Sequence, residues 1–422
     1  MATIDSLIKV PRGLDLLIVG GGLAGLAAAR VAAARGADWL LFEGSDTLGG
    51  RVGTDLVPDS ETGEPFVIDR GFQVLLTSYP ELEESGVLSS LPLGRFEPGA
   101  NVRVTTRSKT RFHRALDVWR RPMSALTFDW RHVFSPGEAM ALMRMRRDAR
   151  NGNIESTRTT RDELVARGFS ERALARFFVP FWGGVLLDRE LAAPWSFTAR
   201  LFDAFSRGDA AIPIGGMRAL PAALATGLDP DRIVLRTKVQ SVGQNHVILD
   251  TGARLVSGRV LVATDGDEAS RLLPESIPTT RWRATTSCYY ASQGPLPAPL
   301  DQRLLILDGD GLGPLHHLAP LSSLGPGFAP EGRGLVVASH DGVADPALEP
   351  ALGAELRAWF PDTTWTLIAV RAIARGLPVI EREPTDFALP MPGLAVAGDH
   401  IADRSIDGAL RSGRLAAQAL FT

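Results

Sequence analysis

Three glycines, Gly20, Gly22 and Gly25, stand at the spacing G-x-G-x-x-G directly after an apolar run, residues 14–19. Residues 26–35 are rich in alanine and arginine and predict a helix, so the glycines occupy a strand-to-helix turn. Such a turn suits a pyrophosphate. The first glycine makes the tight turn, the second lets backbone approach the phosphates, and the third lets helix and strand pack closely. The helix start adds unpaired N–H groups and a positive dipole end.

An acidic residue completes this unit. A second apolar run, residues 39–42, ends in Glu43, about 20 residues beyond the glycines. The Glu43 carboxylate can accept hydrogen bonds from both ribose hydroxyls, which favours an adenosine ribose without a phosphate. Because strand, helix, second strand and acid stand in register, the sequence predicts a dinucleotide site on a βαβ unit.

Two further glycine-rich segments decide which dinucleotide is bound. In residues 48–52, glycines permit close backbone approach, and Arg51 places a forked cation beside a phosphate or a ring edge. In residues 397–413, a strand ends in Gly398-Asp399 and a helix start follows. The carboxylate suits sugar or ribityl hydroxyls, and the helix N–H groups suit a ring carbonyl. A nicotinamide dehydrogenase needs no such remote element, so the pattern predicts a long flavin dinucleotide, FAD.

Composition narrows the class of protein. The 422 residues can form two or three domain-sized cores, and a net charge of −3 gives no electrostatic reason to expect a nucleic-acid partner. A single cysteine, Cys288, excludes an internal disulfide and suits a reducing cytoplasm. Residues 1–11 do not resemble a signal peptide, and no stretch approaches 18 apolar residues. We expect a cytoplasmic protein, and the amphipathic stretch 139–147 leaves peripheral membrane contact open beside simple packing on its own domain.

The order of predicted elements indicates an α/β protein with two interleaved domains. A doubly wound, Rossmann-type FAD-binding domain would comprise residues 1–80, 208–275 and 385–422. A mixed sheet-plus-helix substrate domain would comprise residues 81–207 and 276–384. Local patterns predict a hairpin at residues 100–115, a helical region at 117–207 and the opening of a helix at 214–217. Four short strands are predicted at residues 233–236, 239–242, 246–249 and 259–263. A strand-rich region follows at residues 284–375, with one helix at 346–360, and a last helix is predicted at 405–420.

These motifs resemble the superfamily of FAD-dependent amine oxidases, phytoene desaturases and protoporphyrinogen oxidases. The matching segments follow the family's order over nearly the whole chain, at residues 19–28, 43, 49–52, 69–73, 213–217 with 220, and 398–413. The cofactor-binding set predicted from the motifs and the resemblance is Gly20, Gly22, Leu23, Ala24, Gly25, Glu43, Gly44, Gly50, Arg51, Val52, Gly71, Phe72, Gln73, Val239, Ala263, Gly398, Asp399, Ser405, Ile406 and Ala409. No cysteine or histidine stands in a recognisable flavinylation context, so we expect non-covalent FAD.

The resemblance also implies a role for several of these residues. Arg51 would lie near the pyrophosphate or the isoalloxazine ring, and residues 71–73 would approach the flavin. The backbone of Val239 would meet the adenine, and Asp399 the ribityl–phosphate region. Ile406 and Ala409 would then meet the pyrimidine edge of the ring.

The branch of the family is harder to assign. Amine oxidases of this kind usually carry a lysine that holds a water near flavin N5, and an aromatic cage near the C-terminal motif. The only lysines here are Lys9, Lys109 and Lys238, and residues 404–409 read Arg-Ser-Ile-Asp-Gly-Ala, closer to carotenoid desaturases. The pattern therefore favours desaturation or isomerisation of a small hydrophobic, isoprenoid or polyene-like substrate, with oxygen or a quinone restoring FAD. Oxidation of a porphyrinogen or an amine, and a non-catalytic flavin-binding protein, stay as alternatives.

Few side chains are candidates for catalysis, because flavin N5 itself accepts hydride. Trp182 is a candidate for one wall of a substrate pocket, although a tryptophan in an apolar helix more often belongs to the core. One of Tyr289 and Tyr290, which point opposite ways on a strand, could face the flavin. Of the adjacent histidines 316 and 317, only one can line a cavity, and we name His317 as the candidate for proton transfer.

Three other groups have structural alternatives. Arg371 and Arg375 could hold a substrate carboxylate, although structural pairing is the commoner role of such arginines. Asp69 could orient the loop before Gly71 or simply cap a turn. No Cys/His spacing supports a metal site.

Overall fold

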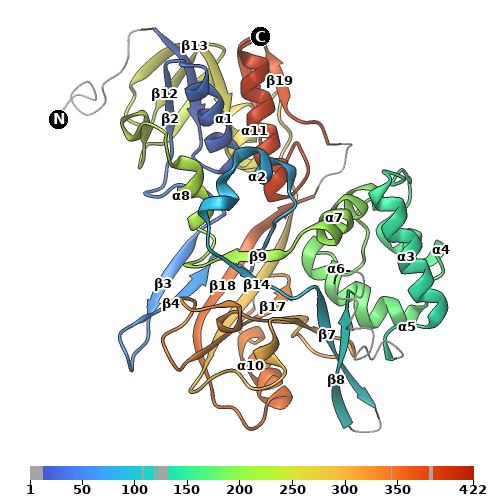
Figure 1. Cartoon of the computed structure of the whole chain (residues 1–422). Helices are drawn as coiled ribbons and strands as arrows, with labels where there is room; N and C mark the ends of the chain where they lie inside the picture. Colours follow the sequence, from blue (N-terminus) through green and yellow to red (C-terminus); the bar gives the residue numbers. More distant parts are fainter. Residues whose placement is uncertain (1–12, 107–108, 118–119, 121–131, 344, 380–383) are drawn as a thin grey trace.

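The computed structural model describes residues 13–106, 109–117, 120, 132–343, 345–379 and 384–422. An eight-stranded sheet occupies the upper part of the molecule in Figure 1. Its strands run in the order β10-β2-β1-β13-β12-β11, with β20 beside β13 and β19 beside β20. They are β1 (Leu14–Val19), β2 (Trp39–Phe42), β10 (Ile233–Val234), β11 (Val239–Gly243), β12 (His246–Leu249), β13 (Arg254–Val262), β19 (Ala388–Met391) and β20 (Leu394–Val396).

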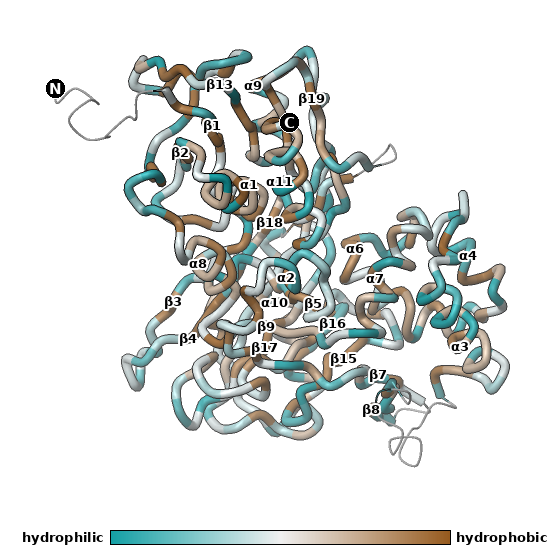
Figure 2. Tube along the Cα trace, turned by 45° about the horizontal axis from the view of Figure 1, so that its top comes forward, coloured by the Kyte–Doolittle hydropathy of each residue, from teal (hydrophilic) through white to brown (hydrophobic). Residues whose placement is uncertain are grey.

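The centre of this sheet is parallel and buried. β1 pairs in parallel with β2 on one side and with β13 on the other, and β13 pairs in parallel with β20. Continuous apolar runs form such strands because both faces of a parallel sheet are covered. Figure 2 shows the hydrophobic segments that run through β1 and the strands beside it. Strands from three distant parts of the chain therefore form one sheet.

Two helices pack side by side on this sheet, α1 (Leu23–Ala34) and α11 (Ile406–Leu420) (Figure 1). The contact is close because Gly413 has no side chain. A Cβ atom there would lie 1.9 Å from the carbonyl oxygen of Ala24. The C-terminal helix thus lies directly against the first helix of the chain.

A seven-stranded sheet forms the second large unit, with strands in the order β18-β14-β17-β16-β15-β7-β8. One of its faces packs against α10 (Leu348–Trp359) around Cys288, Tyr290 and Leu352. The other face joins a larger core that also includes the helical region. Its strands are β7 (Gly99–Thr106), β8 (Lys109–Leu116), β14 (Trp282–Ser292), β15 (Leu305–Asp308), β16 (His317–Pro320), β17 (Gly334–Asp341) and β18 (Trp365–Pro378).

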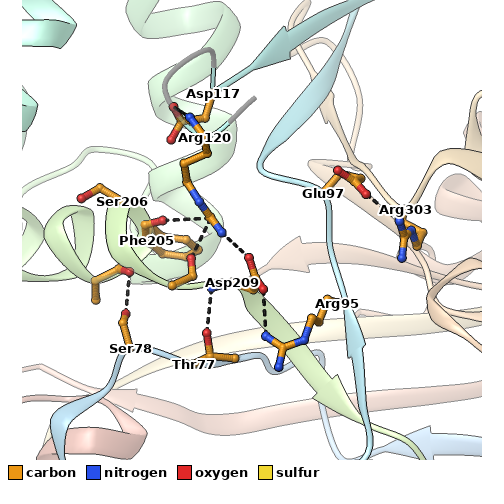
Figure 3. A network of polar contacts seen from close by, with 12 residues as sticks. Thr77, Ser78, Arg95, Glu97, Asp117, Arg120, Phe205, Ser206, Asp209 and Arg303 are labelled. Carbon is orange, nitrogen blue, oxygen red and sulfur yellow. Dashed lines mark hydrogen bonds and ion pairs between the residues drawn. The ribbon is translucent and has the colours of Figure 1, made fainter. Parts of the chain in front are cut away.

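The helical region projects from this core on the right of Figure 1 and contains α3 (Pro136–Arg150), α4 (Thr160–Ala166), α5 (Glu171–Ala173), α6 (Val179–Leu186) and α7 (Trp195–Arg207). Asp209 fixes the exit from α7. Its carboxylate pairs with Arg120 and with Arg95 (2.8 Å), while its backbone N–H donates to the Thr77 hydroxyl (2.9 Å) (Figure 3). Burial alone would raise the pKa of Asp209, but hydrogen bonds from Arg120 and Arg95 outweigh it and lower that pKa.

Two small sheets and several short elements complete the fold. β9 (Ala210–Pro213) lies between β5 and β6, and β3 pairs with β4. The remaining elements are β3 (Thr54–Pro58), β4 (Pro65–Asp69), β5 (Leu75–Leu76), β6 (Leu93–Arg95), α2 (Pro80–Ser85), α8 (Ala219–Ala225), α9 (Gly266–Leu272), short 3-10 turns at Val87–Ser90, Pro230–Arg232, Leu300–Gln302 and Ser322–Leu324, and a π turn at Leu174–Phe178. Among the described residues, no helix has both the length and the apolar character that crossing a membrane requires.

The predicted α/β architecture is confirmed, with local corrections. Residues 214–217 do not open a helix. Gly215 and Gly216 have φ values of +88° and +90°, which no α-helix contains, and α8 begins only at Ala219. The strand predicted at 233–236 ends at Val234 because Arg236 adopts a φ of +55°. The three-segment division into domains stays a prediction, and all eight strands of the first sheet fall within its FAD-binding segments.

Candidate cofactor and substrate site

The first glycine turn has the geometry that its spacing predicts. Gly20 has a φ of +107°, and a Cβ atom there would lie 2.6 Å from the carbonyl oxygen of Ala263, the residue after β13. A Cβ atom on Gly25 would lie 1.9 Å from the Gly20 carbonyl oxygen, so only glycine lets α1 pack this closely. A Cβ atom on Gly22 would meet no atom within 4 Å. The middle glycine therefore presents open space.

The start of α1 adds unsatisfied donors to that space. Its N-cap residue is Gly22, no side chain caps its first turn, and the first turn contains no acidic residue. The side chains of Leu23 and Ala24 are buried, so the backbone N–H groups are what this turn presents. Open space beside free N–H groups at a helix start fits an anionic pyrophosphate.

The second glycine pair is joined directly to the first. The Gly49 N–H donates to the Gly21 carbonyl at 2.9 Å, and Gly22 and Gly49 form an isolated parallel bridge. A Cβ atom on Gly49 would lie 2.3 Å from the carbonyl oxygen of Val52. A Cβ atom on Gly50 would lie 3.5 Å from the Gly22 Cα. Gly20 to Gly25 and Gly49 to Val52 thus form one unit, which we call the glycine cradle.

Glu43 lies at one end of the cradle. Its carboxylate accepts hydrogen bonds from the backbone N–H groups of Gly21 (2.7 Å) and Ser45 (2.8 Å). Beyond it, Lys238 packs on Gly44. The carbonyl of Val239, the residue expected to meet adenine, accepts a hydrogen bond from Arg271 at 2.8 Å.

Arg51 and Asp399 join the two ends of the chain. Their side chains form a salt bridge, and the Arg51 guanidinium also donates to the Gly376 carbonyl at 3.1 Å. The guanidinium carbon lies 5.1 Å from the centre of the Trp282 ring, a cation–π contact. Gly398, two residues after β20, donates its N–H to the Ser412 hydroxyl at 2.9 Å. The C-terminal glycine-aspartate motif therefore reaches the cradle.

His400, next to this pair, was not predicted from the sequence. Both of its ring nitrogens are buried without a hydrogen-bond partner. The ring folds back over Gly398, where a Cβ atom would lie 2.7 Å from Nδ1. Burial lowers the pKa of His400, so the ring is neutral near pH 7. Buried polar atoms without partners fit a site whose remaining partner is a bound ligand, and the signal in the sequence is the position directly after Gly398-Asp399.

The start of α11 has a side-chain cap from within the protein. The Ser405 hydroxyl accepts a hydrogen bond from the Gly408 N–H at 2.9 Å, and Asp407 accepts one from the Glu81 N–H at 2.9 Å. Burial raises the pKa of Asp407 to about 6. The predicted ring contacts Ile406 and Ala409 are half-buried and pack on the large core.

The turn after β4 is the one that the resemblance predicts to approach the flavin. Gly71 has a φ of +99°, and the Phe72 N–H donates to the Ser287 hydroxyl at 3.1 Å. The Gln73 amide donates to the Arg51 carbonyl at 3.3 Å, which ties this turn to the cradle. The Phe72 ring centre lies 5.6 Å from that of His317.

Asp69, the last residue of β4, anchors this turn through several hydrogen bonds. Its carboxylate accepts hydrogen bonds from the Thr54 hydroxyl and from the Met217 N–H (2.9 Å), and its carbonyl accepts one from the Tyr289 hydroxyl (2.9 Å). Burial raises the pKa of Asp69 to about 6 against these hydrogen bonds, which lower it. Asp69 thus joins three segments, a larger role than capping a turn. The Tyr289 hydroxyl is engaged with this backbone.

Two residues on the opposite face of the sheet and two arginines of β18 have structural partners. Tyr290 donates to the Glu349 carboxylate at 3.0 Å, and His316 lies 3.2 Å from Asp341. Arg371 pairs with Asp55 (3.0 Å), and Arg375 pairs with Asp265 (3.1 Å) and Asp267 (2.9 Å). Both arginines therefore have the structural pairing that we expected to be commoner.

The other two catalytic candidates lie where the sheet meets α6. Trp182 is 2% exposed, and its ring lies 5.1 Å from Phe181 and 5.9 Å from Phe205, between ring centres. His317 lies under Gly184, where a Cβ atom would come within 2.8 Å of the imidazole. Burial lowers the pKa of His317 to about 4, so this ring is neutral at pH 7.

A family model for flavin-containing amine oxidoreductases matches residues 23–421, nearly the whole chain. The chain belongs to this family. It is therefore a flavin-dependent oxidoreductase whose cofactor is FAD. Which branch of this family it represents is not decided by the match, and the carotenoid-desaturase assignment stays a prediction.

Solved structures with this fold are similar over almost their entire length. An oxidoreductase from Methanosarcina mazei is 18% identical with a TM-score of 0.72, and the alignment covers 97% of this chain and 100% of that one. Cyclohexylamine oxidase from Brevibacterium oxydans is 18% identical with a TM-score of 0.64, covering 97% and 99%. Reduced UDP-galactopyranose mutase is 15% identical with a TM-score of 0.67, covering 97% and 95%. A search of curated proteins found no match.

Proposed function

We propose that this oxidoreductase removes hydride from, or rearranges, an uncharged and largely apolar substrate over the flavin ring. One observation supports the proposal. The contacts of residues 71–73 are with the Ser287 hydroxyl, the rings of Phe96 and His317, the Ile373 side chain and a backbone carbonyl, and none of these groups carries a charge at pH 7. Uncharged contacts around this turn suit a substrate that is itself neutral.

The residues of this chain have separable tasks in the proposed reaction. Bound FAD supplies a hydride acceptor at N5. The glycine cradle and Glu43 hold the dinucleotide, while Arg51 and Asp399 bring the C-terminal motif to it. The aromatic side chains of α6 and α7 keep water away from the reacting carbon. The neutral ring of His317 is able to hold or pass a proton beside Phe72.

The proposal includes the site through which an oily substrate enters. On α3 the side chains of Met140 and Met143 are exposed beside the exposed arginines 144 and 147. Exposed apolar groups next to cations suit transient contact with an anionic membrane surface. We keep this peripheral contact, a cytoplasmic location and the use of oxygen or a quinone as parts of the proposal.

A direct test uses purified FAD-loaded protein without oxygen. Phytoene-like, squalene-derived, porphyrinogen and amine substrates are mixed with it, and loss of the oxidised flavin absorbance is followed. We expect reduction by a neutral polyene or isoprenoid, or its conversion without net reduction as seen by product analysis. Rapid flavin reduction by simple amines, with peroxide release in air, contradicts the proposal.

Amine oxidation is the second candidate, supported by the description of the family and by relatives named putrescine oxidase and cyclohexylamine oxidase. The lysines distinguish the candidates. Among the described residues, Lys109 lies opposite Thr106 in the β7–β8 hairpin, and Lys238 packs on Gly44 at the adenosine end. Neither position suits a lysine that holds a water at N5, so the neutral substrate is the first choice.

A further inference from the structure

We propose that His317 and Ser339 form a subsite for one uncharged hydrogen-bonding group of the substrate, such as a hydroxyl, a carbonyl or an amide. The inference rests on the proposed function, because it assigns the substrate to the sheet face beside Phe72. It adds that the substrate is not a pure hydrocarbon. The apolar body would carry a single neutral polar group that fixes its register over the flavin.

Strand register brings these side chains together. His317 on β16 and Ser339 on β17 are direct cross-strand partners, and Ser339 is in turn the partner of Ser287 on β14. Side chains of direct partners project from the same face of a sheet about 5 Å apart. Ser287 accepts the Phe72 N–H, and the Phe72 ring contacts His317. The polar row therefore crosses the sheet directly under the turn predicted to approach the flavin.

Two members of the row have unsatisfied polar atoms. The Ser339 hydroxyl oxygen and the His317 Nδ1 are both buried without a hydrogen-bond partner, and the two residues are 1% and 6% exposed. Beyond His317 the row continues with Leu307 and Val102, which are apolar. Beyond Ser287 it ends in Arg371, whose guanidinium pairs with Asp55 at 3.0 Å. A buried polar atom left unpaired is costly, and two of them side by side are explained by a ligand that completes them.

The chemistry of the pair selects the class of ligand group. A hydroxyl and an imidazole offer donors and acceptors, and burial keeps His317 neutral at pH 7 by lowering its pKa to about 4. The pair thus offers no charge to an ammonium or a carboxylate, which would lose its hydration on entering. Gly184 leaves space for the imidazole, since a Cβ atom there would lie 2.8 Å from Nδ1.

The test measures binding without turnover. FAD-loaded protein is titrated with four probes that share one carbon chain, 1-octanol, 2-octanone, octylamine and octanoate, and the shift of the flavin absorption bands is followed at pH 7. We expect the alcohol and the ketone to bind at least about tenfold more tightly than the two ions. Ser339→Ala weakens octanol binding by about fivefold to tenfold, as expected for one lost hydrogen bond.

Matched variants separate a subsite from a structural role. Ser292→Ala removes an equally buried serine of β14 that donates to the Gly294 carbonyl at 2.6 Å, so it lowers the melting temperature and leaves octanol binding unchanged. Ser339→Ala breaks no protein hydrogen bond and leaves the melting temperature unchanged. His317→Leu weakens octanol binding like Ser339→Ala, and His317→Gln restores most of it.

Equal affinity for octanol in the wild type, Ser339→Ala and His317→Leu overturns the subsite, and so does tighter binding of either ion. These outcomes are independent of the proposed function, since octanol need not be oxidised. Flavin reduction by amines together with selective octanol binding at Ser339 would reject the proposed reaction and retain the subsite.

Discussion

Two helices begin at the predicted cofactor site, and their first turns differ. α1 begins after Gly22, without a side-chain cap and without an acid in its first turn. α11 begins after Ser405, whose hydroxyl caps it, and carries Asp407 in its first turn. The helices nevertheless pack directly on one another at Gly413. Both helices start at the same predicted site, but the start of α1 has no side-chain cap and the start of α11 has one.

The difference indicates where binding energy comes from. Free N–H groups at the start of α1 need an anion from outside the protein, so the dinucleotide phosphates should contribute most of the affinity there. At the start of α11 the Gly408 N–H already has a partner in the Ser405 hydroxyl, and the Asp407 carboxylate accepts the Glu81 N–H at the start of α2. We therefore expect α11 to shape the site rather than to provide much of its affinity.

The largest predicted effect separates packing from binding at the first glycines. Gly25→Ala places a Cβ atom 1.9 Å from the Gly20 carbonyl oxygen, and we expect apo-protein stability to fall by about 3 kcal/mol or more. Gly22→Ala is the matched control, because its φ of −74° is ordinary and its Cβ atom meets nothing. Apo-protein stability should then be unchanged. FAD affinity should fall at least about tenfold, which corresponds to the loss of one hydrogen bond to a phosphate.

Thermal melts of apo-protein and fluorescence titration with FAD measure the two effects. A Gly22→Ala protein that binds FAD as tightly as the wild type would remove the assignment of α1 as the open helix start. Equal melting temperatures for Gly25→Ala and Gly22→Ala would show that the close contact of the third glycine is not required.

The second effect concerns the turn that joins the cradle to the flavin side. Burial raises the pKa of Asp69 from 3.8 to about 6, so the folded protein binds this proton more tightly than the unfolded chain does. The free energy of unfolding contributed by Asp69 therefore falls as pH rises from about 4 to 6. Asp69→Asn lacks the titrating carboxyl, so it does not show this loss. Between pH 4 and pH 7 its free energy of unfolding should therefore rise by up to about 3 kcal/mol relative to that of the wild type.

Urea unfolding of both proteins across this pH range gives the difference directly. The difference between the two proteins is needed because the titration of His317 changes the free energy of unfolding with pH in the opposite direction. Its pKa is lowered to about 4, so its contribution to stability is lost as pH falls from about 6.5. A pH-independent difference between wild type and Asp69→Asn would exclude a raised Asp69 pKa.

The cradle was the part of the molecule most completely predictable from sequence. β1 and β2 have exactly the predicted bounds, because continuous apolar runs bounded by glycine and acid have few alternatives. The order of the motifs predicts that Arg51 and Asp399 approach one cofactor, and in the structure their side chains form a salt bridge. The strand and turn signals of the cradle are local, because one short stretch carries each of them.

The substrate side was less predictable for a physical reason. His317 and Ser339 become neighbours only through the register of β16 and β17, and register is set by tertiary packing. The strand pattern indicated that Tyr289 and Tyr290 face opposite ways, but not that the Tyr289 hydroxyl would be used on the Asp69 carbonyl. His400 has a sequence signal only in its position after Gly398-Asp399.

A third prediction tests the adenosine end. Glu43→Gln keeps one acceptor oxygen but cannot accept from both Gly21 and Ser45, so apo-protein stability should fall by about 1 kcal/mol. Loss of the charge-assisted bonds to ribose should weaken FAD binding by about tenfold. Asp46→Asn is the control, because that exposed acid lies 3.7 Å from Arg236 and should change neither quantity. Full flavin occupancy of Glu43→Gln at low free FAD would contradict the ribose contact.

The smallest effect tests the closed helix start. Ser405→Ala leaves the Gly408 N–H without its cap, and removal of such a cap costs about 1 kcal/mol, whereas Ser405→Asp retains it. Because the Ser405 oxygen already serves α11, FAD affinity should change less than about threefold in Ser405→Ala, unlike the loss in Gly22→Ala. Melting temperatures and FAD titrations of the three variants compare the two helix starts on one scale. A tenfold loss of FAD affinity in Ser405→Ala without loss of apo-protein stability would instead make Ser405 a direct cofactor ligand, and the two helix starts would then contribute alike.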